Sequence, residues 1–220
     1  MFKKIQCSIL LTLIAVLSGC ATQTPKVEHT AFNQEKPRSI LIVPVVNDSV
    51  DVDAPDYFLS TVAMPLAEKG YYVFPVNTVK TVLEGEGLYD ANLIHSADPV
   101  KLGSMFGADS ILFVTINKWD AQYVLISTTV TVGFNYRIVS GRTGEELWAA
   151  EKVMQYTPQQ NNSSGNPMAD LLVMAVTAAI TRADPNYIPL TRQANHQVFY
   201  IDQTQLPDGP YLQKEKIKNI

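Results

Sequence analysis

The sequence is poor in the residues from which most catalytic and metal centres are built. Its 220 residues include two cysteines, Cys7 and Cys20, and three histidines, His29, His95 and His196. The histidines do not stand at the spacing of a zinc site, and neither cysteine adds to them. The G-x-G-x-x-G and G-x-x-x-x-G-K-[ST] patterns of phosphate-binding loops are absent, as is the G-x-S-x-G pattern of many hydrolases. We therefore expect no enzymatic activity, no metal and no cofactor.

Positive charge is also scarce. The chain has 17 Lys and Arg residues against 21 Asp and Glu residues, a formal net charge of −4. Lys3 and Lys4 lie at the extreme N-terminus, and no basic cluster with interleaved aromatic side chains occurs elsewhere. Such a surface repels the phosphate backbone, so we expect no binding to nucleic acid. A protein or the cell wall is the expected partner.

Long apolar runs are missing as well. Leu171 to Ile180 is the most apolar later segment, but Asp170 and Arg182 flank it, and it is shorter than the roughly 20 residues that a membrane-spanning helix needs. It therefore predicts a core helix. Near the N-terminus, Ile9 to Leu17 is a second short apolar segment that follows two lysines, a layout typical of a secretory signal peptide.

Leu17, Ser18, Gly19 and Cys20 end this segment and resemble the bacterial lipobox, at which a lipoprotein signal peptide is cleaved. The small residues fit the peptidase, and the Cys20 thiol would carry diacylglycerol. An ordinary signal peptide with a chance cysteine and a buried N-terminal helix are the alternatives. Cleavage before Cys20 removes Cys7, so no intrachain disulfide is expected.

Lipidation predicts a stable membrane anchor, because three acyl chains exceed the two membrane signals that stable anchoring needs. Ala21 stands where, in lipoproteins of this type, Asp marks retention in the inner membrane. We therefore expect the outer membrane, with the protein facing the periplasm, and leave surface exposure open. The predicted organisation is a lipoprotein signal peptide at residues 1–19, a flexible polar tether at 20–38 and a single α/β domain at 39–220.

The first half of the domain alternates strands and helices. Residues 39–46 form a continuous aliphatic run that predicts a buried strand, although Pro44 removes one ladder donor. A helical pattern runs from Phe58 to Leu66 with Pro65 inside it, which predicts a kinked or split helix. Residues 71–76 then predict a second strand.

Two further helices precede the next strand. Asn77 would cap a short helix that runs to about Leu83. Asp98 as N-cap, Pro99 at the first helical position and Gly107 near the end frame the other helix. Strands and helices in this order build an α/β layer.

The second half is dominated by β-structure. Residues 110–119 and 122–140 are two β runs, which Asp120-Ala121 would join as a hairpin connection. In the second run apolar residues alternate with polar ones such as Asn135 and Arg137, so one face is dry and the other wet.

Residues 146–156 return as the third strand of an antiparallel meander. A polar stretch at 157–166 follows, and Asn166 and Pro167 would start an apolar helix that reaches about Ala183. The predicted fold class is therefore α/β (α+β), a mixed sheet flanked by helices, with a C-terminal antiparallel meander and helix.

Two groups of residues could carry chemistry, and each has a plainer explanation. His95 and Asp98 could act as a base and its orienting acid, but a surface hydrogen bond or a helix cap explains the pair as well. The acidic loop at 48–56 follows the first strand, at the edge where α/β sheets bind ligands. It lacks the glycine and terminal Glu of a calcium loop, so we expect solvated side chains and leave a ligand there open.

Four blocks carry a resemblance to a known family. They are PLAEKGYYVFPV (65–76), FGADSILFVTINKW (106–119), SGRTGEELW (140–148) and LPDGPY (206–211). Together with the lipobox, they resemble a family of bacterial lipoproteins typified by a meningococcal surface-antigen lipoprotein. The resemblance covers nearly the whole chain after Cys20.

This resemblance implies a fold similar to the N-terminal domain of the periplasmic protein TolB, with kinship in architecture to curli-secretion lipoproteins and penicillin-binding-protein activators. It also implies a curli-secretion-like lipoprotein as a partner, because genes of the family tend to neighbour one. It implies no catalytic residue, and only Cys20 carries over as a functional position.

Three interpretations of function remain. The first is a non-enzymatic outer-membrane lipoprotein that acts as a periplasmic interaction module in an envelope or secretion-associated complex. The second is an activator of a cell-wall synthase. The third is a pore component that inserts an amphipathic hairpin built around Tyr123 to Ile138, a stretch long enough to cross a bilayer as a strand. A homo-oligomer is compatible with each.

Overall fold

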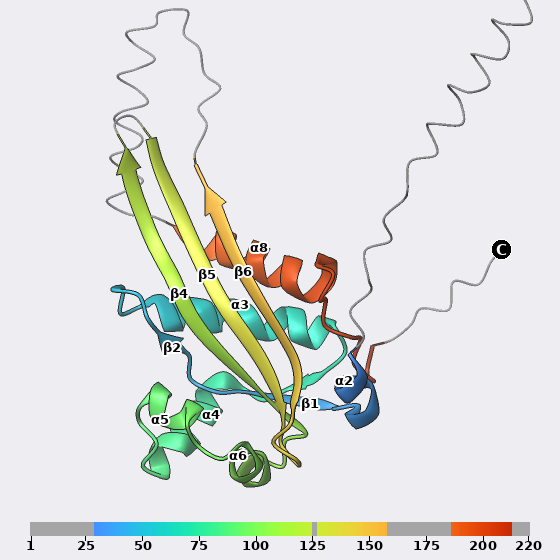
Figure 1. The fold of residues 1–220 in the computed structure, drawn as a ribbon. Coiled ribbons are helices and arrows are strands. Elements are labelled where there is room, and N and C mark those ends of the chain that lie inside the picture. Colours follow the sequence, from blue (N-terminus) through green and yellow to red (C-terminus); the bar gives the residue numbers. More distant parts are fainter. Residues whose placement is uncertain (1–28, 125–126, 158–185, 213–220) are drawn as a thin grey trace, which may run out of the picture.

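The computed structural model describes residues 29–124, 127–157 and 186–212. These residues build one mixed sheet with helices on both faces, as Figure 1 shows, which confirms the predicted fold class. The strands are β1 (Ser39–Ile42), β2 (Val46–Asn47), β3 (Tyr72–Val73), β4 (Ser110–Val124), β5 (Ser127–Ser140) and β6 (Glu146–Tyr156). Their order is β3-β1-β4-β5-β6, with β2 beside β4. The first three strands pair in parallel and the last three form the predicted antiparallel meander.

The helices divide between the two faces. Those of the described residues are α2 (Thr30–Glu35), α3 (Ala54–Glu68), α4 (Val76–Gly85), α5 (Ala91–His95), α6 (Pro99–Phe106), α8 (Ile188–His196) and the π-helical turn η1 (Gln197–Ile201). One face packs against α3, α8 and η1, and the start of the other packs against α4, α5 and α6. Among these helices none is long and apolar enough to cross a membrane.

The single strand predicted at 39–46 is wrong. The chain leaves the ladder at Pro44, which has no N–H to donate, and divides into β1 and β2. Both pieces pair in parallel with β4: Ile40 lies opposite Ser110, and Val46 lies opposite Thr115. The run is therefore buried as predicted, but the proline sets a break in it.

Helix α2 lies inside the segment predicted as tether. Phe32 is buried there, with its ring edge-on to that of Tyr71 at a centroid distance of 6.2 Å. At the end of the helix, the Glu35 carboxylate accepts hydrogen bonds from the Ser140 hydroxyl at 2.7 Å and from Arg142 Nε at 2.9 Å. The folded part therefore begins at α2 rather than at residue 39.

Two helix boundaries also differ from prediction. Helix α3 is continuous from Ala54 to Glu68, so the split expected at Pro65 is wrong; the proline lies in its last turns, where little of the helix remains to be disrupted. Helix α4 starts at Val76 with Pro75 before it, so Asn77 is not its cap.

The frame predicted for α6 is confirmed. The Asp98 carboxylate accepts a hydrogen bond from the Val100 N–H at 2.9 Å, as an N-cap should. Pro99 opens the helix, and Gly107 ends it in the left-handed region with φ of 67°.

The connection predicted at Asp120-Ala121 is wrong. Strand β4 continues through both residues to Val124, and Asp120 pairs with Thr131 of β5. A register shift between Ile116 and Lys118 changes the phase of the side chains, which hid the second half of the strand from a period-two reading. The strand predicted at 71–76 is likewise reduced to Tyr72–Val73, and the helix predicted at 166–183 lies outside the described residues.

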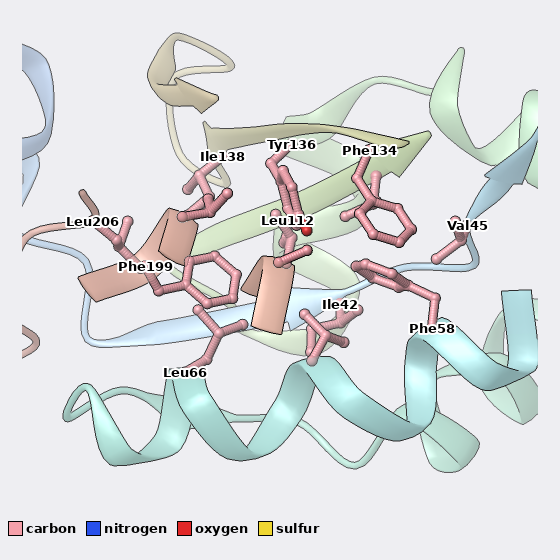
Figure 2. Close-up of a cluster of buried hydrophobic side chains, with 14 of the residues drawn as sticks. Ile42, Val45, Phe58, Leu66, Leu112, Phe134, Tyr136, Ile138, Phe199 and Leu206 are labelled. Carbon is pink, nitrogen blue, oxygen red and sulfur yellow. The ribbon is translucent and has the colours of Figure 1, made fainter. Parts of the chain in front are cut away.

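The larger hydrophobic core lies between the sheet and α3, α8 and η1 (Figure 2). Phe58 and Leu66 point from α3 toward the strands, and Phe199 reaches the same space from η1. The Phe58 ring lies 4.9 Å from that of Phe134, and the Tyr136 ring lies 5.7 Å from that of Phe199. This core fixes the meander against the two long helices.

Candidate functional site

The meander extends beyond the helices that cover its other face. Helices α4, α5 and α6 pack against apolar side chains such as Ile111, Phe113 and Val139 at the start of that face. Further along β4, β5 and β6 the side chains on this face are mostly polar. Figure 1 shows these strands continuing past the three helices. We call this surface the bare face; it carries Thr115, Asn117, Asn135, Arg137, Glu151, Val153 and Gln155.

A groove of about 470 Å³ lies where the bare face meets α5. Its lining includes His95 from α5, Phe113 and Thr115 from β4, Asn135 and Arg137 from β5, and Ala149 and Glu151 from β6. Most of these side chains are polar or charged, so the groove suits a polar ligand or partner better than an apolar one.

Arg137 lies over an aromatic ring rather than beside a carboxylate. Its guanidinium carbon is 4.9 Å from the centroid of the Phe113 ring, a cation–π arrangement. Arg137 makes no ion pair with any described residue. The donors at the edge of the guanidinium therefore face the groove and the solvent.

His95 is held at the base of the groove by the backbone. Its Nε2 donates to the Pro44 carbonyl at 2.9 Å, and its ring stands edge-on to Phe113 at 5.1 Å. Burial lowers the pKa of His95, the hydrogen bond to Pro44 opposes this, and the charge of Arg137 lowers it further. His95 is therefore neutral at pH 7, with Nδ1 available as an acceptor.

The predicted pairing of His95 with Asp98 does not form. The Asp98 carboxylate is used as the N-cap of α6, and the His95 Nε2 is used by Pro44. The helix-cap explanation of Asp98 is therefore confirmed, and the structure does not bring the two residues together as a base with its orienting acid.

The acidic loop at 48–56 is tied to its surroundings by hydrogen bonds. Asp51 accepts from the Trp119 indole N–H at 3.1 Å and from the Asp53 N–H at 2.9 Å. The Asn47 amide donates to the Asp51 carbonyl at 2.7 Å. Within the described residues, no three His, Cys, Asp or Glu side chains gather as a metal site. The loop thus has a structural role in connecting β2 to α3.

The apolar side of β5, which sequence reasoning placed in an insertable hairpin, is part of the core. Val130, Val132, Phe134, Tyr136 and Ile138 are all buried in the cluster under α3, α8 and η1. Their alternation is therefore explained by packing inside the domain.

A second cavity, of about 560 Å³, lies beside α2, where the chain enters the domain. Phe32, Pro37 and Pro207 line it together with Asp208. The segment LPDGPY forms its far wall and is fixed there: Lys69 pairs with Asp208 at 2.8 Å, and the Tyr71 hydroxyl donates to the Pro207 carbonyl at 2.6 Å. The predicted lipidation site, Leu17, Ser18, Gly19 and Cys20, lies outside the described residues.

Sequence reasoning placed Asn135 and Arg137 on a wet face, which the structure confirms, but it did not single them out. Glu151 was missed. The groove depends on the approach of α5 and Pro44 to the meander, and no local pattern in the sequence carries that information.

Three comparisons place the chain among known proteins. A family model described as "Putative lipoprotein GNA1162-like" matches residues 27–210. The curated "Putative lipoprotein NMB1124/NMB1162" of Neisseria meningitidis serogroup B (strain ATCC BAA-335 / MC58) is 35% identical over 174 residues, which cover 79% of this chain and 80% of the relative.

Among solved structures, that of lipoprotein GNA1162 from Neisseria meningitidis is similar with a TM-score of 0.54 and 36% identity, over 66% of this chain and 99% of that one. The PelC dodecamer from Paraburkholderia phytofirmans is a distant likeness, with a TM-score of 0.40 and 14% identity over 73% of this chain and 93% of that one.

Proposed function

Because the chain belongs to the GNA1162-like family of lipoproteins, as its four sequence blocks predicted, we propose that it is a lipid-anchored interaction module of the bacterial envelope. In this proposal Cys20 carries the lipid at the outer membrane, and the domain faces the periplasm. The protein acts by binding a partner protein, with a curli-secretion-like lipoprotein as the first partner to test, and it catalyses no reaction.

The observation that carries this proposal is the bare face. Three long paired strands present polar and charged side chains that no described helix covers. The groove adds a recess at its base. An adjacent set of strands is a stiff support, so side chains on it are held in fixed relation to each other, as a docking surface requires.

The position of α2 supports an orientation for this surface. Glu35 at the end of α2 contacts Ser140 and Arg142, in the turn between β5 and β6. The other ends of the strands therefore point away from the place where the anchored N-terminus enters (Figure 1). At about 3.4 Å per residue, the 14 residues of β5 carry the far end of the bare face several tens of ångströms from the anchor point.

The other interpretations gain no specific support from the geometry. Pore formation by β5 would withdraw Val132, Phe134 and Ile138 from the core. Activation of a cell-wall synthase is a case of partner binding, and identification of the partner would decide it.

Site-specific photocrosslinking in intact cells tests the proposal. We would place a photoreactive amino acid at Asn135 or Gln155 on the bare face, and at Thr78, an exposed residue of α4, as the control. The same crosslinked envelope protein is expected from both bare-face positions and not from Thr78. Equal products from all three positions, or none from Asn135 and Gln155, would overturn the proposal.

A further inference from the structure

Two opposite charges line the groove without meeting each other. Arg137 on β5 and Glu151 on β6 both face the recess, and neither forms an ion pair with a described residue. In the strand register Arg137 lies opposite Ala149, and Glu151 lies opposite Asn135. The two charges are thus diagonal neighbours, with the small Ala149 side chain beside them.

We propose that this groove binds a small zwitterion, an amino acid or short unblocked peptide, whose carboxylate pairs with Arg137 and whose ammonium group pairs with Glu151. The site goes beyond the proposed docking function, because it does not require a partner protein.

The carboxylate end is argued from the donors that remain free. The Arg137 guanidinium packs its face on Phe113, which leaves its edge to form two parallel hydrogen bonds with a carboxylate. Next to it, Asn135 Oδ1 already accepts from Asn117 Nδ2 at 3.1 Å. The Asn135 amide N–H groups therefore remain as further donors to the same carboxylate.

The ammonium end is argued from charge balance. A simple anion in the groove would meet the Glu151 carboxylate, and a simple cation would meet Arg137. An apolar ligand would cover both charges without pairing either, which is unfavourable. His95 is neutral for the reasons given above and adds no second positive charge. A zwitterion is the ligand class that satisfies both sides.

Binding can be measured by isothermal titration calorimetry with the full-length lipidated protein in detergent. The probes are trialanine, its N-acetyl derivative and its C-terminal amide. Trialanine should bind saturably at one site, and each blocked form should bind at least tenfold more weakly. Absence of saturable binding at millimolar trialanine, or equal binding of the blocked forms, would overturn the assignment.

Variants separate the two ends. Arg137→Gln should weaken trialanine at least tenfold and leave the weak affinity for the amide unchanged, because the amide lacks the charge that Arg137 reads. Glu151→Gln should do the same with respect to the N-acetyl form. Arg192→Gln removes the same charge from an exposed position on α8 and should change neither.

These comparisons also distinguish ligand contact from general damage. A variant that merely disturbs the fold would weaken all three probes together, and that result for both Arg137→Gln and Glu151→Gln would count against the site. The outcome is independent of the crosslinking experiment, which tests partner docking and needs no small ligand.

Discussion

The Tyr136 hydroxyl donates a hydrogen bond to Asn195 Oδ1 at 2.8 Å inside the hydrophobic core. Asn195 Nδ2 donates in turn to Thr61 Oγ1 at 3.0 Å, and the Thr61 hydroxyl donates to the Phe58 carbonyl at 2.7 Å. All three polar side chains are buried. One short chain of hydrogen bonds thus joins β5, α8 and α3, and each of its groups depends on the next for a partner.

Loss of the middle group should be costly. Asn195→Ala leaves the Tyr136 and Thr61 hydroxyls without a shared partner and opens a small cavity, so we expect the free energy of unfolding to fall by about 2–4 kcal/mol. Urea denaturation followed by circular dichroism measures this. Gln193→Ala, at an exposed position of the same helix, should change stability by less than about 0.5 kcal/mol. Equal effects of the two substitutions would contradict the role given to Asn195.

Local signals in the sequence predicted much of this fold. The period-two alternation along residues 122–140 predicted the meander, since one covered face imposes that pattern. Asp98, Pro99 and Gly107 predicted α6, because helix caps act through neighbouring backbone groups. The family was predicted as well, from blocks that are spread over the chain.

Errors arose where distant contacts override local patterns. Helix α2 is held by the contact of Phe32 with Tyr71, which a polar composition conceals. The false turn at Asp120-Ala121 followed from the register shift after Ile116. The groove was missed because His95 and Arg137 come from elements that only the fold brings together.

The stability of the domain should depend on pH through His95. Burial lowers the pKa of His95 in the folded protein below the value of about 6.5 expected in the unfolded chain. The unfolded state therefore binds the proton more tightly, so stability is fully present above about pH 6.5 and is lost as the pH falls below it. Denaturation midpoints measured between pH 7.5 and pH 5 should decrease.

His95→Gln should reduce this dependence, because an amide can still donate to the Pro44 carbonyl but does not titrate. Burial also lowers the pKa of His29, so part of the slope should remain until His29→Gln is added. A slope that neither substitution changes would show that other groups control the acid sensitivity.

The anchor can be tested at two adjacent residues. Cys20→Ser should abolish metabolic labelling with palmitate and release the protein from the membrane fraction, since no thiol remains to be acylated. Ala21→Asp should keep the label but move the protein from outer- to inner-membrane fractions on a sucrose gradient, and Ala21→Ser serves as the matched control. Palmitate labelling of the Cys20→Ser variant would refute the assigned lipidation site.

Gly209 offers a test of how the C-terminal segment is fixed to the domain. Its N–H donates to the Lys69 carbonyl at 2.8 Å, and the Tyr211 N–H donates to the Gly70 carbonyl at 3.0 Å. A Cβ atom at Gly209 would collide with the Gly70 carbonyl, which is backbone and cannot turn aside. Gly209→Ala should therefore detach the LPDGPY segment from the end of α3 and break the Lys69–Asp208 ion pair.

Hydrogen exchange detected by mass spectrometry should then show faster exchange at residues 206–212 and in the last turn of α3, with the meander unchanged. Gly85→Ala is the matched control, because nothing lies within 4 Å of a Cβ there and the residue ends helix α4. Alanine favours a helix over glycine by up to about 1 kcal/mol, so this variant should be as stable as the parent or slightly more so. Protection of residues 206–212 that survives Gly209→Ala would mean that Lys69 and Tyr71 hold the segment without the close approach of the two glycines.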